Sequence, residues 1–449
     1  MTADHNTFAS PLIAESTHRE LETAGISAAD HVEALNELSG EACTDHSSSA
    51  LSVRVLLVAD VRSPHTWGWV DAVRSAGVIV LGVDGLTWPE HRPSTARGDA
   101  SDMKVKQLLR SFAGATPKRL ELIGRVRRVA GPLLAPIKGR RIRRVVKRVR
   151  PDLVHGMRIP HEAMIALVAC PPTVPLAVSI WGIDFTNDAS KSRLAGRATR
   201  KILARTDLLF ADCQRDIDLA GTWGLRPDTP TAVLPGGGGI DVARMAEVGA
   251  DITAQLIDLP ESDHRLIINA RGRRPYVRND ILLEALSLLS PDIDPRVRLV
   301  FVDSTHDADL RRSIERHCLR KKIIVTGKCS RGEILSIFRR AEVSVSITDQ
   351  DGTPNTLLEA MAAGAIPVCS DLPSIREWVG HGRNGFLAAF NDPQAVAAAL
   401  QLALGLSDAE RTAIRKENSR IVATRAERGS TGKQAAEKYR RLVMHQRAR

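Results

Sequence analysis

Four carboxylates lie within one short stretch, "DQDGTPNTLLEAMAAGAIPVCSD", at residues 349–371. Asp349 and Asp351 form a DxD pair, and Glu359 follows Asp351 after seven intervening residues. A pair of this kind can hold a divalent cation between substrate phosphates. A single carboxylate can instead accept hydrogen bonds from substrate hydroxyls.

The same stretch contains the start of a helix that follows a strand. The preceding residues, "EVSVSIT" (342–348), alternate Val and Ser, which predicts a short strand. We expect Thr353 to be the N-cap and Pro354 the first helical residue, where a missing N–H costs nothing. The next three N–H groups would then lack partners within the helix and could bind an anion; they belong to Asn355, Thr356 and Leu357.

A sugar attached to a diphosphate would use both features of this stretch. Its phosphates would bind the helix N–H groups, and its hydroxyls would donate to Asp351 and Glu359. A metal ion on the DxD pair would compete with the helix N–H groups for the same phosphates, so we expect no metal here. An ordinary solvent-exposed helix start is the alternative.

Cationic groups are expected close by. The segment "NARGRRPYVRND" (269–280) directly follows an apolar strand and carries four arginines: Arg271, Arg273, Arg274 and Arg278. A guanidinium group stabilises a departing diphosphate well because its planar fork matches phosphate oxygens. One or two of these arginines would suffice, and the others would be solvated.

Two series of short apolar runs alternate with helical patterns and must position these residues. The first series of predicted strands is 53–59, 78–83, 152–156, 175–181, 207–211 and 231–235. The second is 265–270, 296–303, 322–327, 342–347, 366–370 and 385–389. This pattern predicts an α/β protein with two doubly wound, Rossmann-like domains facing a cleft, in which ligands bind at the carboxyl ends of the strands.

We place the domain boundaries from these series. The first domain spans residues 51–238 and contains a basic insertion at 91–150, and the second spans 239–430. Residues 431–449 form a charged helix that could pack back on the first domain. The polar residues 1–50 are interpreted as a mobile leader.

Composition indicates a soluble protein of a reducing compartment. The chain has 449 residues, of which 43% are hydrophobic but only 4% aromatic, so Ala, Val, Ile and Leu must build the cores. Its six cysteines show no CxxC pair, and its N-terminus lacks a basic region followed by an apolar run. An uncharged run at 163–183 imitates a membrane span, but its three prolines favour a buried helix, a turn and a buried strand. We therefore expect a cytoplasmic protein.

The net charge of +11 is concentrated in one segment. Residues 118–150 contain thirteen Lys or Arg and one acid, and the apolar side chains at 142, 145, 146 and 149 follow helical spacing. The segment predicts a basic amphipathic helix. It could be a solvated surface helix, or it could meet anionic lipid headgroups or a phosphorylated acceptor. Nucleic acid is less favoured because aromatic residues for base stacking are almost absent.

Several of these motifs resemble those of one known family. "DGTPNTLLEAMAAGAIPVCSD", "IREWV" and "GRNGFLAAFNDP" are similar to the signature of the family-four retaining glycosyltransferases, which have the GT-B fold. Further matches are "PDLVHGMRIPHEA" (151–163), "VSIWGID" (178–184) and "VLPGGGGID" (233–241). The resemblance covers about residues 52–405.

The resemblance implies roles for individual residues. Glu359 should accept hydrogen bonds from the nucleotide ribose, and Asp351 stands where the family usually has Glu, beside the transferred sugar. Arg271 matches the phosphate-binding Arg of the family, and Arg278 stands in for a Lys that falls at Val277. The backbone expected to line the sugar and diphosphate belongs to Gly352, Asn355, Thr356 and Leu357.

The acceptor side departs from the family pattern. Trp181 and Asp184 stand where the family often has an active-site His. His155 and His161 are candidates to substitute for that histidine, but a structural role near a strand end is favoured for both. We expect the acceptor to bind the first domain through His65, Trp67 and Asp184.

The expected function is therefore that of a retaining glycosyltransferase, with a nucleoside diphosphate sugar as donor and neither metal nor cofactor. Asp351, Arg271 and Arg278 would serve catalysis, and the acceptor would be a glycan or an anionic, lipid-linked precursor near the inner face of the membrane. The alternatives are a non-catalytic sugar-nucleotide-binding or scaffold protein and a sugar-nucleotide epimerase of the same fold.

Overall fold

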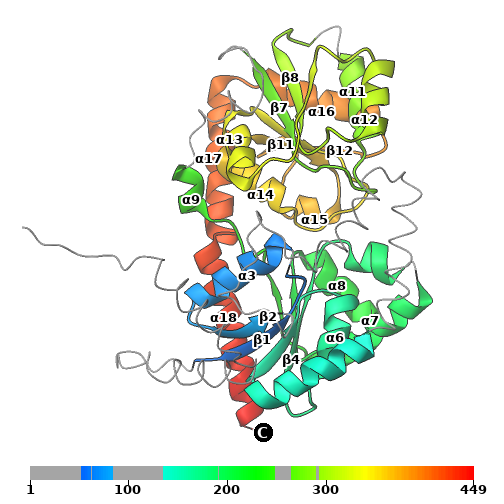
Figure 1. Ribbon diagram of the computed structural model, residues 1–449. Helices are drawn as coiled ribbons and strands as arrows, with labels where there is room; N and C mark the ends of the chain where they lie inside the picture. Colours follow the sequence, from blue (N-terminus) through cyan, green and yellow to red (C-terminus); the bar gives the residue numbers. More distant parts are fainter. Residues whose placement is uncertain are drawn as a thin grey trace, which may run out of the picture. The chain divides into compact units, whose positions relative to one another are not determined.

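The computed structural model describes residues 52–61, 63–83, 135–190, 192–247, 264–289 and 293–448. The unit Met1–Leu51, which includes the predicted leader, lies outside the described residues. So does most of the predicted basic insertion, from 91 to 134. The unit Ser52–Arg449 holds two six-stranded parallel sheets (Figure 1).

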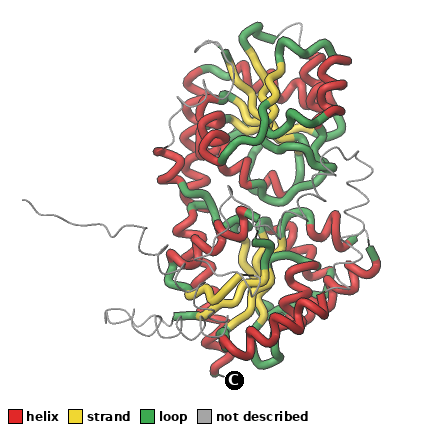
Figure 2. The backbone as a smooth tube through the Cα atoms, viewed as in Figure 1, coloured by secondary structure: helices red, strands yellow, loops and turns green. Residues whose placement is uncertain are grey.

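The first sheet forms what we call the first lobe, with strand order β2-β1-β3-β4-β5-β6. Its strands are β1 (Arg54–Val58), β2 (Ile79–Val83), β3 (Leu153–Gly156), β4 (Leu176–Ile180), β5 (Leu208–Ala211) and β6 (Thr231–Val233). Its helical segments are α3 (Pro64–Ser75), residues 135–149, α6 (His161–Ala169), the π-helix η2 (Asp184–Ala189), α7 (Arg193–Arg205) and α8 (Gln214–Thr222). Most residues of β1, β3, β4 and β5 are apolar and buried, because helices cover both faces of the sheet (Figure 2).

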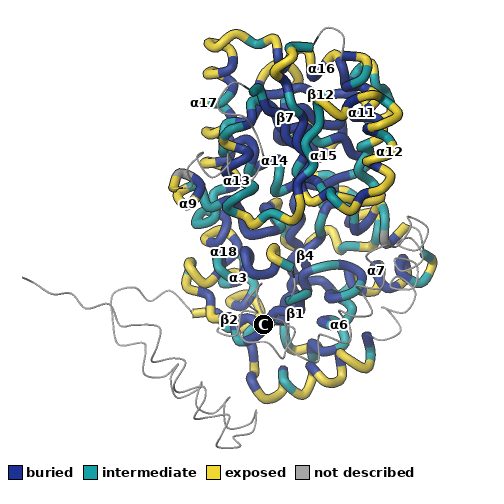
Figure 3. The backbone as a smooth tube through the Cα atoms, turned by 45° about the horizontal axis from the view of Figure 1, so that its top comes forward, coloured by how far each residue is buried: buried dark blue, intermediate teal, exposed yellow. Residues whose placement is uncertain are grey.

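The second sheet forms the second lobe, with strand order β12-β11-β10-β7-β8-β9. Its strands are β7 (Arg265–Asn269), β8 (Val297–Phe301), β9 (Ile323–Val325), β10 (Val343–Ser346), β11 (Ile366–Ser370) and β12 (Phe386–Ala388). Its helices are α9 (Val242–Glu247), α11 (Asn279–Leu289), α12 (Ala308–Arg316), α13 (Arg331–Arg340), α14 (Asn355–Ala363), α15 (Pro373–Arg376), α16 (Pro393–Gly405) and α17 (Asp408–Arg425). Figure 3 shows the buried strands inside their exposed helices.

Each of the twelve predicted strands corresponds to an observed one, and the predicted fold class is confirmed. The strand order also fixes where a ligand should bind. The direction in which successive strands are added to the sheet reverses between β1 and β3 in the first lobe and between β7 and β10 in the second. Ligands of doubly wound sheets bind beyond the carboxyl ends of strands at such a reversal.

The last helix, α18 (Arg428–Arg447), returns to the first lobe and packs against α3. Its fully buried Tyr439 contacts His155 Nδ1 at 2.7 Å and accepts a hydrogen bond from Trp69 Nε1 at 3.1 Å. His155 Nε2 lies 2.9 Å from Ser179 Oγ, and burial lowers the pKa of this histidine to about 3. His155 is therefore a neutral structural residue, as expected. The helix begins before residue 431 because Glu427 accepts hydrogen bonds from the N–H groups of Gly429 and Ser430.

The uncharged run at 163–183 is divided as predicted among α6, a turn and β4. Among the helices of the described ranges, no helix combines the length and the apolar character that crossing a membrane requires.

The contact between α18 and α3 depends on a glycine. A Cβ on Gly432 would lie 2.0 Å from the carbonyl oxygen of Ala72, whereas a Cβ on the helical Gly332 of α13 would meet nothing within 4 Å. We expect Gly432→Ala to lower the free energy of unfolding by about 1–3 kcal/mol, because the two helices must move apart. The same change at Gly332 should raise it by up to about 1 kcal/mol through helix propensity. Urea unfolding measures both variants, and equal effects would contradict the steric argument.

Candidate active site

The helix start at the centre of the predicted site differs from the expected one by a residue. Pro354 is the N-cap of α14, and the helix runs from Asn355 to the left-handed Gly364. Thr353 makes no cap, because its hydroxyl donates to the carbonyl of Asp212 in the first lobe and accepts from Trp378 Nε1 at 2.9 Å. The prediction of Thr353 as N-cap was therefore wrong: a buried hydroxyl found partners in the tertiary structure.

This shift reduces the number of free N–H groups. The amides of Leu357 and Leu358 donate to the Pro354 carbonyl at 3.0 and 3.3 Å, so the prediction that Leu357 offers a free donor is wrong. Within the described residues, the amides of Asn355 and Thr356 have no acceptor. These two N–H groups, at the positive end of the helix dipole, form the anion-binding part of the site.

Arg271 and Asp351 form a buried ion pair beside this helix start. They occupy the loops after β7 and β10, the two strands at the reversal of the second sheet, and Arg271 Nη2 lies 2.6 Å from Asp351 Oδ2. Arg271 Nη1 also donates to Thr356 Oγ1 at 3.1 Å, while its buried Nε has no partner among the described residues. Burial raises the pKa of Asp351, and Arg271 opposes that shift.

Glu359 forms a second ion pair on the same helix. Its Oε1 lies 2.9 Å from Nη2 of Arg331, the first residue of α13. Burial raises the pKa of the Glu359 carboxyl, and Arg331 opposes that shift too. The sequence analysis did not single out Arg331. Its signal was available: "SRGE" (330–333) is a capping box that follows a predicted strand, and the structure contains that box.

His65 brings the first lobe to this site. It lies in the first turn of α3, and its Nδ1 is 3.0 Å from Asn355 Nδ2. Its ring meets Trp181 edge to face, with 5.6 Å between centroids. His65 is exposed, but desolvation by the surrounding protein and the charges of nearby arginines lower its pKa to about 4, which favours the neutral ring at pH 7. These arginines are Arg274, Arg158, Arg331 and Arg271.

Arg274 is another cation of the predicted loop whose charge acts on the residues of this site. The charge of Arg274 helps to lower the pKa of His65, and Arg274 Nη1 donates a hydrogen bond to the Arg271 carbonyl at 3.2 Å. Arg278 instead pairs with Asp280 at 2.7 Å near the surface. It forms no hydrogen bond with Asp351 or Arg271. A catalytic role for Arg278 stays a prediction.

The other two predicted acceptor residues lie inside the first lobe. Trp67 is 5% exposed and donates from Nε1 to the carbonyl of Val61 at 2.7 Å. Asp184 is fully buried, accepts from the Trp181 amide at 3.0 Å and pairs with Arg158 at 3.2 Å. Their contact with an acceptor stays a prediction, and His65 is the one of the three that reaches the site directly.

Gly352 joins the loop to the first lobe. A Cβ on Gly352 would lie 2.3 Å from Gly182 Cα, so only glycine permits the two backbones to approach so closely. Its amide donates to Asp351 Oδ1 at 3.1 Å.

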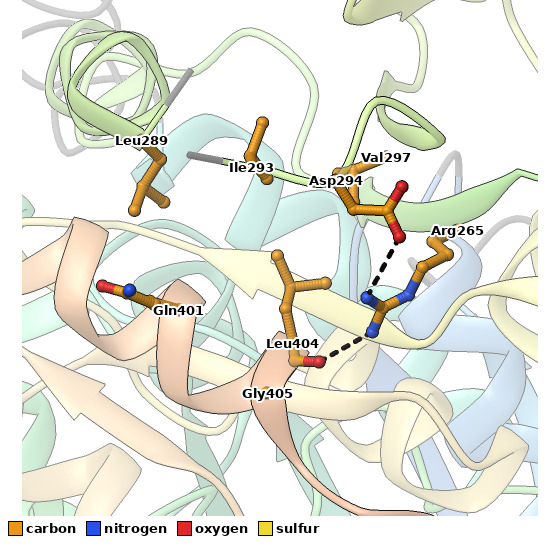
Figure 4. A pocket seen from close by; sticks show the side chains of 8 residues that line it. All are labelled: Arg265, Leu289, Ile293, Asp294, Val297, Gln401, Leu404 and Gly405. Carbon is orange, nitrogen blue, oxygen red and sulfur yellow. Dashed lines mark hydrogen bonds and ion pairs between the residues drawn. The ribbon is translucent and has the colours of Figure 1, made fainter. Parts of the chain in front are cut away.

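A separate hollow of about 250 Å³ lies at the opposite end of the second sheet (Figure 4). It is lined by Arg265 and Val297, the first residues of β7 and β8, with Leu289, Asp294 and Leu404 among the others. Arg265 is already occupied by Glu342, Asp294 and the Leu404 carbonyl. The ends of β7 and β10 that carry the site therefore lie away from this hollow.

Two family profiles match this chain over most of its length. The profile described as a glycosyl transferase 4-like domain matches residues 46–237, and that for glycosyl transferases group 1 matches residues 251–421. The chain belongs to the group 1 glycosyltransferases.

Curated relatives of this glycosyltransferase match over part of their length. A GDP-mannose:cellobiosyl-diphosphopolyprenol alpha-mannosyltransferase of Xanthomonas campestris is 31% identical over 144 residues, 30% of this chain and 38% of that protein. A putative glycosyltransferase, EpsD of Bacillus subtilis, is 31% identical over 121 residues, 27% of this chain and 31% of that protein. The chain thus aligns with about a third of the length of these relatives.

Solved structures share the fold of this glycosyltransferase. A glycosyltransferase from Rickettsia africae has a TM-score of 0.65 at 14% identity, covering 88% of this chain and 99% of that one. The Anabaena protein HepE in complex with UDP-glucose has a TM-score of 0.61 at 16% identity, covering 86% and 99%. At these identities the likeness shows the GT-B fold.

The half-buried Glu359 gives the first test of the site. We expect Glu359→Gln to weaken binding of the nucleoside diphosphate about ten- to a hundredfold, because a charged hydrogen-bond acceptor contributes about 1.5–3 kcal/mol. Isothermal titration calorimetry with UDP and GDP measures the change. The matched control is Glu417→Gln, which removes an exposed ion pair with Arg420 on α17. Unchanged affinity of the Glu359 variant would remove Glu359 from the binding site.

Proposed function

We propose that this protein transfers a sugar from a nucleoside diphosphate sugar to an acceptor, with retention at the anomeric carbon and without a metal ion. One arrangement carries the proposal: the free N–H groups of Asn355 and Thr356 lie on a helix that Arg271 and Arg331 contact, next to the buried Asp351 and the half-buried Glu359. N–H groups and arginines suit phosphates, and Asp351 and Glu359 suit sugar and ribose hydroxyls.

The donor's diphosphate completes the hydrogen bonding of the cations. Arg271 still has an unused Nε, and Arg274 has only a backbone carbonyl as its recorded acceptor. Both would donate to phosphate oxygens while Arg271 keeps its bond to Asp351. These groups are fixed before the reaction, so they can stabilise the charge that develops on the leaving diphosphate.

The proton of the acceptor goes to the leaving group in this proposal. The acceptor oxygen forms its bond to the anomeric carbon as the bond from that carbon to the phosphate oxygen breaks. The acceptor oxygen attacks from the face that the phosphate leaves, which gives retention. Its proton moves to the departing phosphate oxygen on that same face. His65 is neutral, and through Nδ1 it holds the Asn355 side chain, so its role is to position α14 and the acceptor.

The names of relatives support the donor class and suggest the acceptor. The Xanthomonas relative is named for GDP-mannose and a cellobiosyl-diphosphopolyprenol, and HepE was solved with UDP-glucose. We therefore propose a lipid-linked glycan with a diphosphate as acceptor, at the inner face of the cytoplasmic membrane.

The basic helix at 135–149 supports a membrane surface. Its buried side chains, including Ile142, Val146 and Val149, pack into the core of the first lobe, so its apolar face is covered by protein. Its exposed side is cationic, with no acid between residues 135 and 150. The exposed cations are Lys138, Arg140, Arg141, Arg143, Arg144, Lys147, Arg148 and Arg150. Such a surface binds anionic headgroups by charge, with about 1 kcal/mol per Lys or Arg near the membrane.

The transferase is tested by supplying donors. We expect one of the UDP, GDP or ADP sugars to raise the melting temperature and to be transferred to a polyprenyl-diphosphate-linked glycan. Proton NMR of the product should show the donor's anomeric configuration, and EDTA should leave the rate within about twofold, because arginines and helix N–H groups do the work of a metal ion. An inverted product or a strict need for Mg²⁺ would refute that part of the proposal. Binding without transfer would favour a non-catalytic binder, and conversion of the donor sugar would favour an epimerase.

The membrane surface is tested separately by flotation with vesicles. We expect the protein to float with vesicles rich in phosphatidylglycerol but not with neutral ones. Replacing Arg140, Arg141, Arg144 and Arg148 by Gln should abolish flotation, since about 4 kcal/mol of attraction is lost. The control replaces four exposed cations of the second lobe: Arg312, Arg316, Arg320 and Lys321. Equal flotation of both variants would remove the helix from the membrane contact.

A further inference from the structure

We propose that Arg215 of the first lobe is a positioning residue for the donor site, and that with Glu377 of the second lobe it forms a latch joining the lobes at the loop 351–353. The latch is defined by these two residues. This inference rests on the proposed function only where it concerns the rate of transfer.

The carboxylate of Glu377 binds the start of a helix in the other lobe. It follows α15, and its Oε2 and Oε1 accept hydrogen bonds from the amides of Gln214 and Arg215, at 2.9 and 3.3 Å. These amides open α8, whose N-cap, Cys213, makes no side-chain cap. A carboxylate at this position is favoured by the helix dipole as well as by the two hydrogen bonds. The second lobe therefore supplies the cap that the first lobe lacks.

The side chain of Arg215 reaches the opposite way, into the loop that carries Asp351. Its Nη1 donates to the Asp351 carbonyl at 2.6 Å, and Ser374 Oγ donates to the same oxygen at 2.7 Å. On its own lobe, Arg215 is held by Asp216 Oδ1 at 2.8 Å and by the Gly182 carbonyl. Asp351 therefore accepts a hydrogen bond from the first lobe at its carbonyl and forms an ion pair with Arg271 at its carboxylate.

Two further contacts between the lobes fall on the same three residues. Gly352 touches the backbone of Gly182, and the Thr353 hydroxyl donates to the Asp212 carbonyl. Residues 351–353 therefore hold their conformation partly through the first lobe. The donor site can reach its full geometry only when the lobes are joined.

Arg215 also balances buried negative charge. Asp212 and Asp216 lie within a few ångströms of each other, both buried, and burial raises the pKa of each. The positive charge of Arg215 opposes the rise in pKa of both carboxyl groups, and its side chain is 17% exposed. Because a buried acid is costly without its partner, this arginine is fixed in place before it contacts the other lobe.

The latch is not backed by close packing on its outer side. A crevice of about 470 Å³ opens there, lined by Gln214, Arg215, Asp218 and Leu219 of α8 and by Pro373 and Glu377. With an open crevice beside them, these hydrogen bonds can be lost without disrupting a hydrophobic core.

The first test compares Arg215→Met with the wild type. We expect kcat to fall about tenfold to a hundredfold, because loss of a positioning contact of this kind costs up to about a hundredfold. The affinity for UDP or GDP should change less than about threefold, because the arginines and α14 lie in the second lobe. Arg215→Lys should recover part of the rate, since one ammonium can still reach the Asp351 carbonyl. Equal loss of affinity and rate would overturn a positioning role.

The second test does not depend on activity. Hydrogen exchange in a peptide that covers residues 347–358 should become faster in both Arg215→Met and Glu377→Ala. The second variant keeps the ion pair between Asp216 and Arg215, so it still tests the latch if Arg215→Met folds poorly. The matched control is Arg376→Ala, next to Glu377 in the sequence, which removes an ion pair with Asp371 at the surface. Unchanged exchange in both latch variants refutes the latch. If the wild type transfers no sugar, the proposed function fails, while the exchange result still decides the latch.

Discussion

The buried ion pair between Arg271 and Asp351 is the interaction on which the rest of the site depends. At 2.6 Å, with both side chains almost inaccessible, it costs desolvation that its Coulomb attraction only partly offsets. It nevertheless fixes two loops from different strands against each other. Once Arg271 is fixed, Thr356 and the start of α14 are fixed as well, and the free amides at the helix start acquire a defined direction.

The order of the strands explains why these residues can meet. Arg271 and Asp351 are 80 residues apart in sequence, but β7 and β10 are neighbours in the sheet. Their loops diverge at the reversal of chain direction, which leaves room above the sheet edge for a ligand. His65 and Arg158 follow β1 and β3, the equivalent strands of the first lobe. Both halves therefore present their chemical groups at the same topological position.

The sequence predicted positions along strands well and side-chain partners poorly. Strand patterns are local, so the twelve strands and the helix at 355 could be found from periodicity and turn residues. Partners depend on long-range packing. Thr353 was predicted to be an N-cap, but its hydroxyl bonds to the Asp212 carbonyl and to Trp378 Nε1 instead. Arg278 was predicted to bind the diphosphate with Arg271, and in the structure it pairs with Asp280. Arg158, Arg215 and Arg331 were missed because the rule of strand ends was applied to one loop only.

The charge of the site argues that an anion belongs in it. Three of its arginines have acids of their own: Arg271 has Asp351, Arg331 has Glu359 and Arg158 has Asp184. Arg274 makes no hydrogen bond or ion pair with a carboxylate of the described residues, and its charge helps to lower the pKa of both Asp351 and His65. A protonated His65 would add to this excess, so the site keeps that ring neutral instead. An incoming diphosphate meets Arg274 beside the amides of Asn355 and Thr356, which have no acceptor within the part of the chain that the structure describes.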